Sequence, residues 1–202
     1  KNLKNDIKIL KKLKVEYILT PNVNDIYKNN SDKKLKLSKI DKIMCASYRP
    51  GHFEGVLAVI NQFLKKIKPK YIFLGEKDYQ QLFLIKRLIK RKFKVKVIPC
   101  KTIRDKNNVA LSSRNILLTK KDLKKSSYIA SILISLKNKI KKNISFKNKL
   151  KSTKKKINNL KNIKIEYLEI RNKQNLSNNF NKNNFKIFLA YYNKNVRLID
   201  NY

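Results

Sequence analysis

The chain has 202 residues, 42% of them hydrophobic, and carries a formal net charge of +38. This length and this apolar fraction are enough for a buried core, which excludes wholesale disorder. No apolar run reaches the ~18 residues that would span a bilayer, and the first residues do not form a signal peptide. We therefore expect a cytoplasmic protein without a membrane partner.

The positive charge is spread along the whole chain. Lysine stands almost everywhere beside asparagine and isoleucine, three residues whose codons are rich in A and T. A nucleic-acid-binding protein usually gathers its basic residues on one face. The even spread favours a codon bias of the genome, so we expect no nucleic-acid partner.

The two cysteines, Cys45 and Cys100, follow no metal-ligand spacing, and the chain has a single histidine, His52. A zinc site is therefore not expected. Scattered thiols fit a reducing compartment, and we interpret both cysteines as small apolar fillers of the core.

Hydrophobic spacing predicts alternating strands and helices in the first half of the chain, an order that indicates a parallel α/β sheet. The run at 71–74 is typical of a buried parallel strand, which ends at Gly75. The predicted elements are a helix at 3–10, strands at 15–19 and 35–37, a helix from His52 to Pro69, a strand at 71–74, a helix over 82–89, and a strand at 93–97 closed by Pro99.

The order changes after about residue 115. Thr119 is a suitable N-cap for a helix, and two helices followed by three strand-like runs indicate a small α+β unit. We place a domain boundary at 115–119, which gives domains at 1–115 and 116–202. The predicted elements are a helix with its apolar face at 129–140, a more polar helix at 146–160, and strands at 163–170, 185–192 and 196–199.

All three glycines of the chain lie in two short clusters. The first cluster, RPGHFEGV at 49–56, turns the chain into a helix. One interpretation puts Arg49 and His52 beside an anionic substrate at the helix N-terminus. The other makes Pro50 and Gly51 a turn and His52 a capping or packing residue, and from this cluster alone the second is favoured.

The second cluster, GEKDYQQ at 75–81, directly follows the predicted buried strand. Open α/β sheets bind ligands beyond the carboxyl ends of their strands, so Lys77 would meet a phosphate there. Asp78 would hold a ribose or a magnesium ion. Asp78 and Gln81 are also spaced for a capping box with no ligand, and spacing alone does not separate the two interpretations.

The third cluster, LSSRN at 111–115, follows a polar turn. Two hydroxyls beside a guanidinium suit a polyphosphate, because Arg114 offers a bidentate fork and Ser112 and Ser113 offer neutral hydrogen bonds. A helix cap before the second domain would explain either serine, but it explains Arg114 less well.

The order of these clusters resembles the pantothenate synthetase (pantoate–β-alanine ligase) family. YLEIR at 167–171 and VRLIDN at 196–201 are similar to the family's C-terminal strands, so the resemblance covers nearly the whole chain. Its most specific part is GEKDYQQ followed by LSSRN. It implies a Rossmann-like parallel sheet in residues 1–115, with its N-terminal part missing, followed by a small α+β C-terminal domain in 116–202.

The resemblance also implies the site residues. Lys77 and Arg114 would be catalytic, Gln81 would hydrogen-bond pantoate, and Asp78 would hold Mg²⁺. The residues implied to bind ATP are Gly75, Glu76, Lys77, Asp78, Ile103, Leu111, Ser112, Ser113 and Arg114.

The reaction implied by the resemblance is the ATP-dependent joining of pantoate and β-alanine. The pantoate carboxylate attacks the α-phosphate of ATP with Mg²⁺ present, pyrophosphate leaves, and the amine of β-alanine then displaces AMP from pantoyl adenylate. Lys77 and Arg114 would stabilise the charge that develops in the first step. Members of the family are usually homodimers, and the segment 35–37 lies where subunits often pair.

The chain departs from the family pattern at several places. It begins at Lys1, and the family's first strand, its His-containing loop and one pantoate-binding Gln have no counterpart, so we expect the catalytic histidines in a missing N-terminal segment. Cys45 and Ala46 stand where members often carry Glu-Gly. Asn108 fills a turn position that is usually Gly, and Asn tolerates the left-handed conformation that such a position requires.

Three interpretations are therefore open. The first is the ligase, present as a fragment of a longer product, and the second is a truncated or decayed homologue that catalyses nothing. The third is a basic nucleic-acid-binding module, which predicts aromatic residues on a charged face. The aromatic residues here lie largely within apolar runs, which counts against the third.

Overall fold

A computed structural model describes residues 3–27, 35–142 and 146–202 of the chain. It confirms the predicted order of a parallel α/β unit followed by an α+β unit. The helices are α1 (Leu3–Lys12), α2 (Val23–Ile26), α3 (Cys45–Tyr48), α4 (His52–Ile67), α5 (Tyr79–Lys92), α6 (Lys120–Lys141) and α7 (Phe146–Asn158). The strands are β1 (Tyr71–Gly75), β2 (Lys96–Cys100), β3 (Ile163–Asn172), β4 (Phe185–Asn193) and β5 (Val196–Asn201).

β1 and β2 form a parallel pair joined through α5, as a parallel connection requires. Their register runs from Tyr71 opposite Lys96 to Gly75 opposite Cys100. Short 3₁₀ helices follow at Glu76–Asp78, directly after β1, and at Ser113–Leu117. The carboxyl end of β1 therefore leads straight into the GEKDYQQ cluster, which begins α5.

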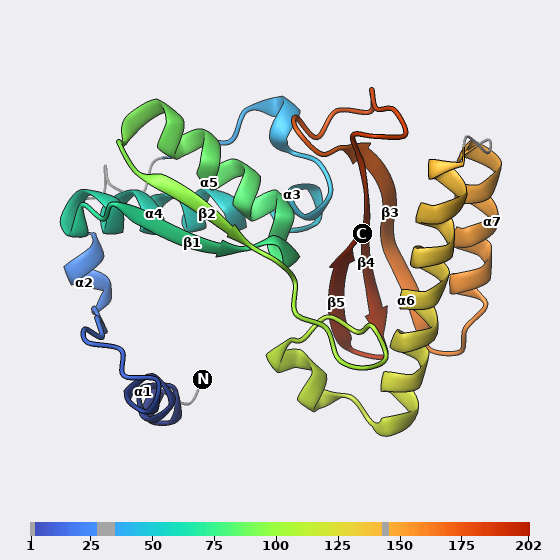
Figure 1. The fold of residues 1–202 in the computed structure, drawn as a ribbon, viewed down its shortest axis with the longest axis horizontal. Helices are drawn as coiled ribbons and strands as arrows, with labels where there is room; N and C mark the ends of the chain where they lie inside the picture. The colour runs from blue at the N-terminus through green and yellow to red at the C-terminus, as the bar shows by residue number, and fades with distance from the viewer. Residues whose placement is uncertain (1–2, 28–34, 143–145) are drawn as a thin grey trace.

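β3, β4 and β5 form a separate antiparallel sheet with β4 in the centre. β4 is buried on both faces of the sheet. Side chains alternate along a strand, so neighbouring residues of β4 reach opposite faces. Its residues Ile187 and Leu189 join a core cluster with α6 and α7, while Phe188 and Ala190 join a second cluster with α4 and α5. Figure 1 shows the sheet between the two sets of helices.

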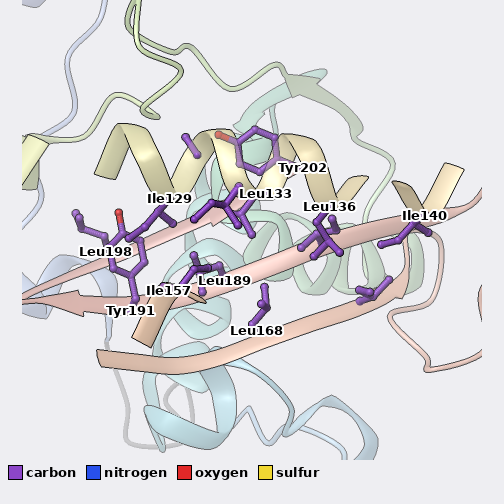
Figure 2. Close-up of a cluster of buried hydrophobic side chains, with 14 of the residues drawn as sticks. Ile129, Leu133, Leu136, Ile140, Ile157, Leu168, Leu189, Tyr191, Leu198 and Tyr202 are labelled. Carbon is purple, nitrogen blue, oxygen red and sulfur yellow. The ribbon is translucent and has the colours of Figure 1, made fainter. Parts of the chain in front are cut away.

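The first cluster lies between α6 and one face of the antiparallel sheet. Figure 2 shows Leu133, Leu136 and Ile140 of α6 directed toward strand residues that include Leu168 and Leu189. Leu133, Leu168 and Leu189 are completely buried, so this face forms a closed core. The apolar face predicted for the helix after Thr119 is thus confirmed.

Two predicted strands are wrong. Residues 15–19 and 35–37 have no regular secondary structure. In the first, the residues have no partner strand in the part of the chain that the structure describes, and Tyr17 is 89% exposed. In the second, Leu35 and Leu37 each pack against the second cluster, which buries part of both side chains without strand pairing.

Two further predictions, on the burial of β1 and on the end of β2, need correction. β1 is not fully buried, because Ile72 and Leu74 pack on the second cluster whereas Phe73 on the opposite face is 67% exposed. No described element covers that face of the pair. β2 begins at Lys96 and includes Pro99, which the sequence pattern had placed after the strand. Proline fits there because β2 is an edge strand of the described sheet.

Among residues 3–27, 35–142 and 146–202, no helix has both the length and the apolar character to cross a membrane.

Candidate functional site

A cavity of about 260 Å³ lies where the carboxyl end of β1, the start of α4, the LSSRN loop and β5 meet. It gathers residues from all three sequence clusters and from the C-terminal sheet. The lining residues are Met44, Cys45, Arg49, His52, Phe53, Lys77, Asp78, Tyr79, Gln80, Gln81, Ser112, Ser113, Arg114, Tyr167, Phe188, Arg197, Ile199, Asp200 and Asn201.

The turn after β1 supplies Lys77, Asp78 and Gln81 to this cavity. Asp78 precedes α5 as its N-cap, but its side chain makes no capping hydrogen bond. The capping-box interpretation of Asp78 and Gln81 is therefore wrong. Within the described residues Asp78 also has no ion pair, so its carboxylate is available to a ligand or a cation.

The LSSRN loop supplies Ser112, Ser113 and Arg114. Ser112 caps the following 3₁₀ helix, because its Oγ accepts from the backbone N–H of Arg114 at 3.2 Å. The Arg114 guanidinium donates to the backbone oxygen of Arg197 at 2.9 Å. One such bond leaves most of its N–H groups available, and it fixes the side chain at the edge of the cavity.

The RPGHFEGV cluster also reaches the cavity, through Arg49 and His52. Gly51 is the N-cap of α4 and adopts φ 77°, a left-handed conformation that favours glycine. His52 is therefore the first residue of the helix and not its cap. Partial burial lowers the pKa of the His52 imidazole, and the nearby Arg49 lowers it further, so the ring is neutral at neutral pH. This geometry supports the substrate-side interpretation over capping.

Sequence reasoning missed the contribution of the last strand. Arg197, Asp200 and Asn201 of β5 line the cavity, although VRLIDN was assigned only as a strand. Asn201 Nδ2 donates to the backbone oxygens of Glu76 and Lys77, at 2.9 Å each. Two adjacent polar residues at the end of this strand were the available signal, but the pattern did not show what they would meet.

Cys45 is buried at the wall of the cavity. Its Sγ lies 3.0 Å from the Tyr167 hydroxyl and 3.3 Å from an Arg197 nitrogen. Arg197 in turn forms a salt bridge with Glu166. Cys45 is therefore more than an apolar filler, and Cys100 is not a filler either, because it is exposed.

Other predicted residues lie outside the lining of the cavity. Gly75 and Glu76 belong to the turn that carries Lys77, and Glu76 offers its backbone oxygen to Asn201. Ile103 and Leu111 are exposed and joined by a backbone hydrogen bond of 2.9 Å. The roles proposed for these four residues stay predictions.

The cavity is cationic. Arg49, Lys77 and Arg114 form no ion pair within the described residues, and Asp78 is the lining carboxylate without a cation partner there. Asp200 is already bound by Arg104 at 2.8 Å. Such an excess of fixed positive charge suits a polyanionic ligand. No group of three or more histidine, cysteine, aspartate or glutamate residues that could hold a metal ion occurs in the described part of the chain.

The fold and the cavity define an α/β protein of the nucleotide-binding class, with its candidate site at the carboxyl end of a parallel strand. The family model described as pantoate-beta-alanine ligase matches residues 1–202, and the chain belongs to this family of ATP-utilising ligases. The predicted resemblance is thereby confirmed.

Three known proteins illustrate the match. The pantothenate synthetase of Buchnera aphidicola subsp. Acyrthosiphon pisum is 35% identical over 206 residues, which cover 100% of this chain and 72% of that protein. The crystal structure of pantothenate synthetase from Thermus thermophilus has a TM-score of 0.88 and 25% identity, over 100% of this chain and 74% of that one. The ligase from Francisella tularensis, complexed with beta-gamma ATP and beta-alanine, has a TM-score of 0.78 and 36% identity, over 100% and 70%.

Proposed function

We propose that this chain takes part in the ATP-dependent joining of pantoate to β-alanine, with pantoyl adenylate as the intermediate. The observation that carries the proposal is the convergence of Lys77, Gln81 and Arg114 on one cationic cavity. If Lys77 and Arg114 lay on opposite sides of the molecule, they could not contact one triphosphate. The Francisella relative, crystallised with beta-gamma ATP and beta-alanine, supports the same ligands for this chain.

The first step of the proposed reaction is the attack of the pantoate carboxylate on the α-phosphate of ATP. A P–O bond to the carboxylate forms, the bond to the β-phosphate breaks, and pyrophosphate leaves. Negative charge grows on the leaving group during this step. Lys77 and Arg114 stabilise that charge from fixed positions, and Ser112 and Ser113 donate neutral hydrogen bonds to phosphate oxygens.

The second step is the attack of the β-alanine amine on the acyl carbon of pantoyl adenylate. The amide bond forms, the bond to the AMP oxygen breaks, and the amine loses a proton. Gln81 holds pantoate by hydrogen bonds through both steps. His52 at the start of α4 also lines the cavity, and Arg49 lies near enough to lower the pKa of its imidazole.

Mg²⁺ is part of the proposal, and the donors present fit it. Mg²⁺ typically binds one or two carboxylates together with substrate phosphates and water. Asp78 supplies one such carboxylate without a competing partner in the described chain. The ion would neutralise phosphate charge while Asp78 holds it against the turn.

The homodimer and the cytoplasmic location stay predictions. Leu35 and Leu37, near the expected subunit contact, pack partly on the chain's own second cluster. Sedimentation of the purified chain tests the dimer. The nucleic-acid-binding alternative has no observation of the structure in its favour, and the decayed homologue is separated from the ligase by the experiment that follows.

The test is the release of pyrophosphate from ATP by the chain with pantoate and Mg²⁺, followed by pantothenate formation when β-alanine is added. The activity of these residues alone is doubtful, so we expect both products from the chain when it is joined to the family's His-containing N-terminal segment, and this joined protein is the parent for the variants. Lys77→Ala should lower the rate about 10²–10³-fold, because it removes one donor that stabilises the developing charge.

Lys90→Ala is the matched control, since Lys90 is an exposed lysine of α5 outside the cavity lining. It should leave the rate unchanged. A folded parent chain that releases no pyrophosphate would support the decayed homologue instead. A Lys77→Ala chain as fast as its parent would remove Lys77 from the reaction.

A further inference from the structure

We propose that Asn201 is a positioning residue that fixes the phosphate-binding turn from the far end of the sequence. Its side-chain amide holds the backbone of Glu76 and Lys77, so that the Lys77 ammonium is aimed into the cavity. The expected consequence of this restraint is tighter nucleotide binding, and that consequence rests on the proposed function. Its physical content, the restraint of the turn, does not depend on any ligand.

The contacts of the Asn201 amide group define the restraint. Nδ2 donates to the Glu76 oxygen and to the Lys77 oxygen, both at 2.9 Å, across 125 and 124 residues of chain. One NH₂ group thus uses both of its protons on two consecutive carbonyls. A turn held at two adjacent peptide groups has little freedom to rotate, which fixes the direction of the side chain between them.

The orientation of this amide is unambiguous. A flipped amide would place Oδ1 against the two carbonyl oxygens, three acceptors without a proton. Asn201 is only 4% exposed, and its Oδ1 is buried without a hydrogen-bond partner in the described structure. A buried unsatisfied carbonyl destabilises a fold, so overall stability does not explain an asparagine here. The two hydrogen bonds that Nδ2 donates to Glu76 and Lys77 do explain it.

The same strand, β5, also holds the LSSRN side of the cavity. The Arg197 backbone oxygen accepts from Arg114, and Asp200 binds Arg104 in the loop that precedes LSSRN. One strand therefore sets the positions of Lys77 and Arg114 relative to each other. Within this arrangement, Asn201 restrains Lys77.

The experiment compares Asn201→Leu with Asn193→Leu. Leucine has nearly the shape of asparagine but no donor. Asn193 is the matched control, because it is completely buried, its Nδ2 donates to one main-chain oxygen of Asp122 at 3.0 Å, and its Oδ1 also lacks a partner in the described chain. It does not line the cavity.

The first readout is amide hydrogen exchange of residues 75–79 in the full chain without nucleotide. We expect Asn201→Leu to speed this exchange about tenfold or more, while Asn193→Leu leaves it unchanged. The second readout is ATP binding by calorimetry, which Asn201→Leu should weaken about tenfold, as expected for two lost hydrogen bonds. Asn201→Ser replaces the leucine variant if the latter does not fold.

Unchanged exchange at 75–79 in the Asn201 variant overturns the proposal. So does faster exchange with ATP affinity equal to the parent, because the restraint would then not position the ligand-binding group. A parent protein that also carries the family's N-terminal segment and still binds no ATP defeats the proposed function and, with it, the positioning role, while the exchange data still decide whether Asn201 restrains the turn.

Discussion

At the scale of single residues, Arg104 joins two segments that lie 96 residues apart in the sequence. Its guanidinium donates to both carboxylate oxygens of Asp200, at 2.9 and 2.8 Å, and to the Tyr202 hydroxyl at 2.7 Å. It also lies over the Tyr202 ring, 4.1 Å from the centroid. Bidentate pairing and stacking on an aromatic face are both specific to the planar guanidinium.

We predict that Arg104→Met lowers the free energy of unfolding by roughly 2–3 kcal/mol, because it leaves the mostly buried Asp200 carboxylate unpaired. Urea denaturation followed by circular dichroism measures the change. Arg91→Met, at the exposed end of α5, is the control and should have little effect. A loss below about 0.5 kcal/mol for Arg104→Met, the range of an ordinary surface substitution, would contradict the prediction.

The site residues found from the sequence were recognised because each stands beside its neighbours in a short motif. Lys77, Ser112, Ser113 and Arg114 stand in short motifs, and all four line the cavity as expected. Asn108 adopts φ 64°, which confirms the left-handed turn predicted for it. Asn201 escaped prediction, since hydrophobic spacing carries no information about a contact with residues 76 and 77.

At the scale of elements, prediction succeeded where the helix or strand has a packed face and local end signals. α6 begins after Thr119, whose Oγ1 accepts from the Asp122 N–H, as the N-cap prediction required. The three C-terminal strands were predicted because each shows as a run of apolar residues, and these residues pack in the two core clusters. At residues 15–19 the prediction failed, since a short apolar run forms a strand only where a neighbour completes the hydrogen bonds. The division at 115–116 stays a prediction.

The start of α6 is also where we predict a pH dependence of stability. The Thr119 hydroxyl holds the pKa of the Asp122 carboxyl well below its usual 3.8, and Lys194 and Lys125 lower it further. Lys194 lies in the turn between β4 and β5, so the ionised carboxylate ties α6 to the sheet at 2.9 Å. A pKa lowered by folding gives a contribution that is complete above the unfolded value and is lost as pH falls below it.

The measurement is urea unfolding of the parent chain and of Asp122→Asn at about pH 6 and about pH 3, on either side of the ordinary aspartate pKa. The parent should lose stability on acidification, and the difference between parent and variant should shrink. Asp6→Asn, which removes an exposed carboxylate of α1, is the control and should keep a constant difference. An Asp122→Asn chain with the full pH dependence of its parent would contradict the assignment.

At the scale of the whole molecule, the antiparallel sheet positions the parts of the site. One face of the sheet packs on α6 and α7, and the other packs on α4 and α5. The first turns of α4 and α5 contribute residues to the cavity. The sequence indicated the two layers, because each strand and helix shows its own apolar pattern. It did not indicate that residues such as Tyr167 and Phe188 of the second unit would face the first, since both units offered apolar faces and periodicity does not pair them.

The net charge of +38 gives the last prediction, which concerns stability and not the fold. Compact packing brings like charges closer than in the unfolded chain, and salt screens them over about 30 Å at 0.01 M but about 8 Å at 0.15 M. Raising NaCl between these values should therefore raise the melting temperature by at least about 3 °C, roughly 1 kcal/mol for a chain of this size. Differential scanning fluorimetry measures it.

A charge variant separates this repulsion from other effects of salt. Lys151, Lys154 and Lys155 are exposed residues of α7, away from the cavity, and each Lys→Glu replacement lowers the net charge by two. The triple variant should melt higher than the parent at 0.01 M and gain less from added salt, because less repulsion is left to screen. If parent and variant respond equally to salt, the gain comes from stronger apolar burial or from ion binding, and the spread of lysines does not weaken this fold.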